Sequence, residues 1–280
     1  MKSWIKLIFS ALPWGLWTHE PQTFESWKGV LETRTSALSS LPRILLFPKD
    51  KASVLAPRDC SPQIAAINFA RREAHSHSNR AFDMDIGTLT CVAAPETPLE
   101  DYVRPPIRQD VREGQTGIQM RLDVTVIDVT TCESMPNVMV EVWSSNAVGS
   151  YGSSFLRGAF TSARDGVAQF QTVFPGYTST GANHVNLMVH ASDSMSGSTV
   201  SHVGQVFFTD RWTDVVSMTS PYNQNNNTRV CNSQDPNYAA ATAGGYNAHV
   251  DIQSIHDDWP EGVVGYITIG VNPENRNIPH

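Results

Sequence analysis

A stretch of strict alternation near the middle of the chain limits the fold more than any other feature. Met120, Leu122, Val124 and Val126 alternate with polar or charged residues over Gln119–Thr125. A period of two places all four apolar side chains on one face of an extended strand, whereas a helix would scatter them. The segment therefore predicts a half-buried β-strand with one face in a hydrophobic core.

Short segments of the same kind recur later, separated by turn signals. The pair Asp165-Gly166 predicts a hairpin turn, and Pro175-Gly176 interrupts the chain again. The further strands that we expect are Val138–Ser144, Val167–Val173, His184–His190, Gly204–Phe208 and Gly265–Val271. A run of short strands with turns between them is typical of an antiparallel β-sandwich. We therefore expect an all-β fold with a short helical N-terminal extension.

The N-terminal part follows a different pattern. Residues 1–20 resemble a signal-like leader, with a basic start before an apolar stretch but no small-residue cleavage site. Residues 21–84 form an extension with one or two expected helices. One helix begins at Ser61-Pro62, by the preferences of helix N-termini, and runs to about Glu73. Residues 85–280 then form the expected β-sandwich domain.

Charge and hydropathy exclude two classes of partner. The chain has 280 residues, a formal net charge of −7 and no basic run, whereas nucleic-acid binding depends on clustered Lys and Arg. No segment reaches the roughly 20 apolar residues of a membrane span. We therefore expect neither nucleic acid nor a membrane as a partner. The oligomeric state has no signal in the sequence.

The chain contains four cysteines, Cys60, Cys91, Cys132 and Cys231. Their wide spacing has no CxxC or zinc-like pattern, and it allows three pairings if all four are oxidised. The alternative is four buried thiols. Because disulfides persist in oxidising compartments, a disulfide framework and secretion are linked expectations.

The segment Val140–His190 contains most of the side chains that could do chemistry. Tyr151, Tyr177 and His184 stand out, because phenolate oxygen and imidazole nitrogen together suit a hard, oxidised metal such as Fe(III). A tyrosine in a β-rich protein also serves as a half-buried packing residue with its hydroxyl in water. Spacing alone leaves both interpretations open.

Motifs spread over most of the chain carry a more specific signal. They are Thr90-Cys91-Val92, Pro95-Glu96, Ile107-Arg108, Asp110-x-Arg112-Glu113-Gly114-Gln115, Val126-Ile127-Asp128-Val129, Thr131-Cys132-Glu133, Pro136-Asn137, Val142-Trp143, Phe155-Leu156-Arg157-Gly158, Phe174-Pro175-Gly176, Gly204-Gln205-x-Phe207-Phe208 and Ile267-Thr268-x-Gly270. Over roughly residues 85–272, this order resembles the fungal branch of the intradiol ring-cleavage dioxygenases. These are non-heme Fe(III) enzymes that split catechols between their two hydroxyl groups. Fungal members are commonly secreted, so the resemblance also implies secretion.

The resemblance implies an iron site that this sequence meets only in part. In the family, iron is held by one Tyr after a Trp-His-Ala-Asn segment, one Tyr in Pro-Gly-x-Tyr, and both His of a His-x-His strand. Tyr151 matches the first Tyr and His184 the first His. Asn186 stands at the second His, and Tyr177 comes one residue early, with Thr178 in the ligand's register. An amide is a weaker donor, and a one-residue shift in an extended segment turns the side chain to the other face.

Other positions of the expected site also differ from the family. Gly181 replaces an Arg that holds charge on the bound aromatic, and Ser144 replaces the His of a Trp-His pair, whereas Gln205 matches an active-site Gln. The candidate substrate contacts are Gly181, Ser144, Tyr102 and Arg157. The smaller side chains at the first two positions indicate a substrate that is bulkier or less anionic than catechol.

Three functional hypotheses follow from this set. In the first, Tyr151, Tyr177 and His184 bind Fe(III), with Asn186 or water as the fourth donor, and the enzyme cleaves a catechol with O2. In the second, iron is absent or weakly bound. Tyr151, His184, Gln205, Tyr177 and Asn186 then catalyse redox-neutral acid–base chemistry on a small phenolic or polyketide-like secondary metabolite, by isomerisation, cyclisation or dehydration. The third is a binding protein on the same scaffold. The missing donor and the missing positive charge favour the second.

Overall fold

The structure is a computed structural model. It describes residues 60–74, 92–93, 95–196, 199–255 and 259–275. All of them belong to one compact unit, Leu55–His280. The expected leader, most of the expected extension and Cys91 lie outside the described residues. No helix in the described part of the chain is long and apolar enough to cross a membrane.

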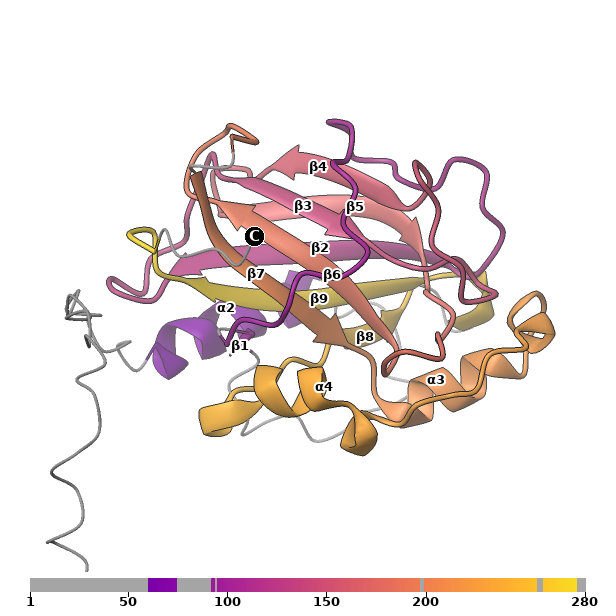
Figure 1. The fold of residues 1–280 in the computed structure, drawn as a ribbon. Coiled ribbons are helices and arrows are strands. Elements are labelled where there is room, and N and C mark those ends of the chain that lie inside the picture. The colour runs from indigo at the N-terminus through magenta and orange to yellow at the C-terminus, as the bar shows by residue number, and fades with distance from the viewer. Residues whose placement is uncertain (1–59, 75–91, 94, 197–198, 256–258, 276–280) are drawn as a thin grey trace, which may run out of the picture. The chain divides into compact units, whose positions relative to one another are not determined.

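The described strands form two sheets, whose arrangement can be followed in Figure 1. The first sheet has the order β1-β9-β2-β5 with β8 beside β9, and the second has the order β4-β3-β6-β7. The strands are β1 Val92–Ala93, β2 Gln119–Asp128, β3 Met139–Trp143, β4 Arg157–Thr161, β5 Val167–Val173, β6 His184–His190, β7 Val200–Phe207, β8 Asp251–Ser254 and β9 Val263–Val271.

Most neighbouring strands are antiparallel, as expected, but β9 is antiparallel only to β8. It runs parallel to both β1 and β2. Parallel neighbours need a long connection between them, and here the chain passes through the whole second sheet between β2 and β9. The expected strands β5 and β6 have the predicted bounds. The short strands β1, β4 and β8 were not predicted from the sequence.

Apolar side chains from both sheets meet in one hydrophobic core. Met120, Leu122, Val124 and Val126 are at most 2 % exposed, as their alternation predicts. They belong to the same cluster as side chains of the second sheet, such as Leu187 of β6. Full burial of one such side chain contributes roughly 1.5–3 kcal/mol relative to exposure, so this cluster is the main source of stability for both sheets.

The opposite face of β2 differs from the prediction of a half-buried strand. Thr125 and Ile127 lie on that face and are also buried. Ile127 packs in a second cluster with Ile64 of helix α2, which spans Ser61–Ala74 as the sequence indicates. A disulfide between Cys60 and Cys132 links the start of this helix to the turn after β2. The prediction failed here because the covering helix comes from a distant part of the chain.

The Asn-rich segment Tyr222–Tyr238 is partly buried, although its polar composition is typical of a surface loop. It follows helix α3, Asp210–Ser217, and leads into helix α4, Pro236–Ala241. Tyr222 donates a hydrogen bond to Phe174 O at 2.6 Å and accepts one from Ile118 N at 3.0 Å. Short 3-10 turns, η3 Tyr222–Gln224 and η4 Asn232–Gln234, shape the segment, and η5 Ala243–Gly245 and η6 Trp259–Glu261 follow it. An Asn-rich composition signals exposure, but it carries no information on such anchoring contacts.

Candidate active site

One face of strand β6 carries several of the candidate residues. His184, Asn186 and Met188 lie on that face, because side chains alternate along a strand. The register places Asn186 opposite Trp143 on β3 and opposite Gln205 on β7. The sheet itself therefore brings Gln205 beside Asn186, although 19 positions separate them in the sequence.

Tyr151 comes from the loop between β3 and β4 and contacts this face. Its hydroxyl oxygen is 3.1 Å from His184 Nε2, and Asn186 Nδ2 donates to it at 3.0 Å. Gln205 Nε2 donates to Asn186 Oδ1 at 3.0 Å and lies 3.4 Å from His184 Nε2. These four residues, all predicted from the sequence to be catalytic, form one hydrogen-bonded group that we call the Tyr151 cluster.

The hydrogen bonds determine which nitrogen of His184 carries its proton. His184 Nδ1 lies 2.6 Å from the carbonyl oxygen of Ala182. A carbonyl can only accept, so Nδ1 carries the hydrogen and Nε2 presents a lone pair in the neutral ring. The hydroxyl of Tyr151 therefore donates to His184 Nε2.

Burial sets the protonation states of both groups. It lowers the pKa of His184 below its usual value, because a buried imidazolium loses hydration, although the bond to Ala182 O and nearby carboxylates act in the opposite direction. Burial also raises the pKa of the Tyr151 phenol, against the effect of the hydrogen bond from Asn186. Near neutral pH the pair consists of a neutral acceptor, His184, and an O–H donor, Tyr151.

Arg157, predicted to be a substrate contact, lies beside Tyr151. Its guanidinium carbon is 5.8 Å from the centre of the Tyr151 ring. Its Nε donates to Gly152 O at 2.6 Å, which fixes the loop that carries Tyr151. The side chain is buried, and its Nη1 has no hydrogen-bond partner among the residues that the structure describes. The Nη1 amino group of this buried cation is thus free to donate to an acceptor.

Glu100 also belongs to the site, although it was not predicted from the sequence. Its Oε2 accepts from Gln205 Nε2 at 3.4 Å, and its Oε1 accepts from Asn237 Nδ2 at 3.0 Å. Its backbone oxygen accepts from Trp143 Nε1 at 2.8 Å. The segment before β2 therefore reaches across the second sheet, and no motif around Glu100 signals this contact.

Asp235 supplies a second carboxylate that was not predicted. It caps helix α4 by accepting from Asn237 N, and its Oδ2 accepts from Ala182 N at 2.7 Å. A Cβ atom on Gly181 would lie 3.0 Å from Asp235 Oδ2 and 3.7 Å from His184 Cε1. A carboxylate thus lies next to Gly181, the position where the resemblance in sequence implies an Arg. Asp235-Pro236 is a helix-start signal, but it does not predict a contact with position 182.

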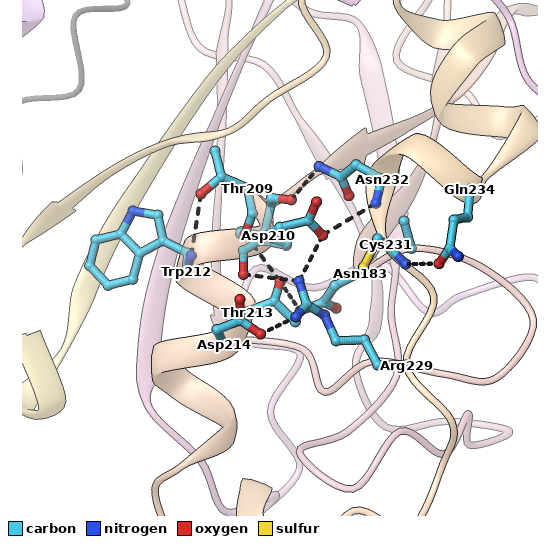
Figure 2. Close-up of polar contacts among 12 residues, drawn as sticks. Asn183, Thr209, Asp210, Trp212, Thr213, Asp214, Arg229, Cys231, Asn232 and Gln234 are labelled. Carbon is cyan, nitrogen blue, oxygen red and sulfur yellow. Dashed lines mark hydrogen bonds and ion pairs between the residues drawn. The ribbon is translucent and has the colours of Figure 1, made fainter. Parts of the chain in front are cut away.

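A polar network holds the segment that carries Asp235 against helix α3 (Figure 2). Arg229 forms ion pairs with Asp210, at 2.7 Å, and with Asp214. Asn232 donates through its backbone N–H to Asp210 Oδ1 at 3.2 Å, and through its side chain to Phe208 O at 3.0 Å. These contacts fix the chain three residues before Asp235 and so help to position its carboxylate.

Tyr177 does not join the Tyr151 cluster in this structure. It lines a pocket with Phe174, Tyr222 and Asn225, and its backbone oxygen accepts from Asn225 Nδ2 at 2.8 Å. No hydrogen bond or ring contact among the described residues links its phenol to Tyr151 or His184. Thr178, which occupies the ligand's register, is buried with its hydroxyl 3.2 Å from that of Thr180.

The two remaining candidate contacts have other hydrogen-bond partners, although Tyr102 packs against the same hydrophobic group as Tyr151. Tyr102 donates to Glu141 Oε2 at 3.1 Å and packs edge-on against Trp143. Burial, together with the charge of Glu141, raises the pKa of Tyr102 to about 12. Ser144 is buried, and its backbone N–H donates to Leu156 O at 3.1 Å. Neither side chain has a hydrogen bond to the Tyr151 cluster in the described part of the chain.

The donor set does not match the Fe(III) ligands that the resemblance in sequence implies. Tyr151 and His184 hydrogen-bond to each other, and Asn186 directs an N–H group, not its oxygen, at the phenol. At Tyr177, the hydrogen bonds among the described residues involve its backbone oxygen. No group of three or more His, Cys, Asp or Glu side chains that could hold a metal occurs among the described residues. Of the four donors that the resemblance implies, Tyr151 and His184 lie together among the described residues, 3.1 Å apart.

No family model matches the sequence, and no curated protein matches it. Among solved structures, an intradiol ring-cleavage dioxygenase from Tetranychus urticae is 24 % identical, with a TM-score of 0.59, over 67 % of this chain and 98 % of its own. A second dioxygenase is 24 % identical, with a TM-score of 0.58, over 67 % and 97 %. Catechol 1,2-dioxygenase from Pseudomonas arvilla C-1 is 14 % identical, with a TM-score of 0.44, over 79 % and 72 %. The first two likenesses show that this chain has the fold of the intradiol ring-cleavage dioxygenases.

Proposed function

We propose that this chain is a divergent enzyme on the intradiol dioxygenase fold that acts on a small phenolic or polyketide-like molecule by redox-neutral acid–base chemistry. The reaction is an isomerisation, cyclisation or dehydration. The observation that carries the proposal is the hydrogen bond from the Tyr151 hydroxyl to His184 Nε2, 3.1 Å long. It joins a neutral base to a protonated acid in a buried site, which is the pairing that proton transfer requires.

His184 is the base in this mechanism. Its Nε2 lone pair takes a proton from a carbon or a hydroxyl group of the bound molecule. The Nδ1–H bond to Ala182 O holds the ring in the required tautomer and stabilises the imidazolium that forms. The same proton then returns to another atom of the molecule, which completes an isomerisation, or leaves with a hydroxyl group as water, which completes a dehydration.

Tyr151 is the acid that supports charge on oxygen. In the free protein the Tyr151 hydroxyl donates to His184. When a ligand is bound, the same hydroxyl donates instead to a carbonyl oxygen of the ligand on which negative charge develops. Asn186 keeps the phenol in position through its 3.0 Å hydrogen bond. The guanidinium of Arg157, 5.8 Å from the ring centre, stabilises negative charge that is shared with the phenol. No oxidant takes part.

The alternative is Fe(III)-dependent cleavage of a catechol ring with O2. The fold supports it, and one structural neighbour is an intradiol ring-cleavage dioxygenase. It requires Tyr177 to join Tyr151 and His184 around one iron, with Asn186 or water as the fourth donor. The arrangement of Tyr177 and the direction of the Asn186 amide count against it.

Two wider features belong to the same proposal. We propose that residues 85–280 form a single β-sandwich domain, which the core shared by both sheets supports. We also propose that the protein is secreted, because the disulfide Cys60–Cys132 is of a kind that persists in oxidising compartments. A leader at residues 1–20 and a fungal secondary-metabolite substrate remain part of the proposal.

The test is a substrate screen analysed by mass spectrometry. The full chain is incubated with phenols, hydroxyquinones and small aromatic polyketides in the presence of an iron chelator, with and without O2. We expect a product of unchanged mass, or one that has lost water, in both atmospheres. Ring cleavage would instead need O2 and add both its oxygen atoms to the product. The Tyr151→Phe and His184→Gln variants should lose the activity, and Tyr177→Phe should keep it.

A further inference from the structure

Three carboxylates surround the Tyr151 cluster. Glu100 reaches it through Gln205, whose Nε2 lies 3.4 Å from Glu100 Oε2 and 3.4 Å from His184 Nε2. Asp235 Oδ2 and His184 Cε1 both lie within 4 Å of the point where a Cβ atom on Gly181 would stand. Asp101, next to Glu100, interacts electrostatically with both Tyr151 and His184.

One cation lies against the cluster in the part of the chain that the structure describes. Arg157 contacts the ring of Tyr151. With three acidic side chains and one basic side chain, the surroundings of the cluster are negative at neutral pH. A ligand that carries its own negative charge is repelled there, whereas a cation is attracted.

An unsatisfied acceptor inside the cluster shows which polar group the ligand must present. Gln205 Oε1 is buried and has no hydrogen-bond partner among the described residues. The amide orientation is fixed, because Gln205 Nε2 faces the oxygens of Asn186 and Glu100 and the lone pair of His184. A buried acceptor without a donor costs free energy, and an O–H or N–H group of a ligand would remove that cost.

The negative surroundings and the free acceptor lead to one conclusion about the ligand. We infer that the Tyr151 cluster selects hydroxyaromatic molecules that carry no negative charge, and that it binds those with an ammonium group more tightly than their carboxylate analogues. This inference rests on the proposed function, because it names the substrate class of the same site. Arg157 Nη1 then receives a neutral acceptor of the ligand, such as a carbonyl or ether oxygen.

The experiment compares three ligands of similar size that differ in charge. Tyramine, 4-propylphenol and 4-hydroxyphenylacetate are titrated into the full chain by calorimetry at neutral pH and low ionic strength. We expect tyramine to bind about tenfold more tightly than 4-hydroxyphenylacetate, with 4-propylphenol between them. In Glu100→Gln the ratio of the tyramine affinity to the 4-hydroxyphenylacetate affinity should fall several-fold. It should also fall in high salt, since ions screen such interactions.

A matched variant shows whether the effect is local. Glu133→Gln removes an exposed carboxylate in the turn after β2. The ratio of the tyramine affinity to the 4-hydroxyphenylacetate affinity should be the same in this variant as in the wild type. If Glu100→Gln does not fold, the affinity ratio can be compared between Asp235→Asn and the wild type instead. It can also be compared between low and high salt in the wild type. A ratio that neither substitution nor salt changes would overturn the inference.

The remaining outcomes separate the inference from the proposed function. If 4-hydroxyphenylacetate binds as tightly as tyramine, or more tightly, the charge selection is wrong and the proposed chemistry stands. If none of the three ligands binds at millimolar concentration to folded protein, both the inference and the proposed function are contradicted.

Discussion

The hydroxyl oxygen of Tyr151 lies 3.1 Å from Nε2 of His184, and a third group holds each of them in place. Asn186 donates to the phenol, and the carbonyl oxygen of Ala182 accepts from the imidazole. Two side chains that hydrogen-bond to each other in this way are arranged to exchange a proton.

Removal of the Tyr151 hydroxyl should reduce catalysis far more than stability. We expect Tyr151→Phe to lower kcat/KM by about 10²–10⁴, the usual contribution of a positioned acid or base. The free energy of unfolding should fall by only about 1–3 kcal/mol, because the ring stays while His184 Nε2 and the Asn186 amide lose a partner. Steady-state kinetics and urea denaturation measure the two effects.

Tyr177→Phe is the matched control for that variant. Its phenol has no described contact with the cluster, so kcat/KM should stay within about twofold of wild type. A loss as large as that of Tyr151→Phe would show that both phenols act together, as an iron site requires, and would contradict the acid–base account.

The pH dependence of activity should report the neutral state of His184. Burial lowers its pKa, so the ring remains an acceptor until the pH falls below 6.5. Protonation consumes the Nε2 lone pair, so kcat/KM should be constant near neutrality and decline on acidification with an apparent pKa below 6.5. A rise of kcat/KM on acidification would mean that the imidazolium is the active form.

His202 should contribute to acid unfolding. It is buried on β7 without a partner for Nε2 among the described residues, and burial lowers its pKa to about 4. Between about pH 6.5 and pH 4 the unfolded state binds the proton and the folded state does not, so stability decreases on acidification by up to about 1.4 kcal/mol per pH unit. Denaturation curves at about pH 7 and about pH 4.5 should show a smaller loss for His202→Leu than for wild type. Equal losses would rule out this role.

The disulfide Cys60–Cys132 should be a major source of stability. It joins residues 72 positions apart, and closing a loop of that length in the unfolded chain is worth about 4 kcal/mol. The double variant Cys60→Ser with Cys132→Ser should lose an amount of this order in guanidinium denaturation. Cys231→Ser, which changes a free thiol, should stay near wild type. Equal stability of the double variant and wild type would show that the bond does not constrain the chain.

Local periodicity was enough to predict much of the fold. The alternation from Met120 to Val126 identified β2 and its core face, and β5 and β6 have the predicted bounds. Periodicity failed where burial comes from distant segments. Ile127 is covered by helix α2, and Tyr222 is anchored to Phe174 from inside a polar segment.

The candidate site was predictable only in part, for a similar reason. The family motifs pointed to Tyr151, His184 and Gln205, which the structure places in contact with Asn186. Glu100 lies 105 positions from Gln205 in the sequence, and its contact depends on how a loop crosses the sheet. No local pattern encodes such a crossing.

The most direct test of the account is the iron content of the purified protein, measured by elemental analysis with a visible spectrum of the same sample. The measurement is repeated after incubation with ferric iron and removal of the excess. The account predicts far less than one iron per chain and no tyrosinate-to-iron charge-transfer band in either sample. About one iron per chain, with a charge-transfer band that disappears in Tyr151→Phe, would contradict it and restore ring cleavage as the function.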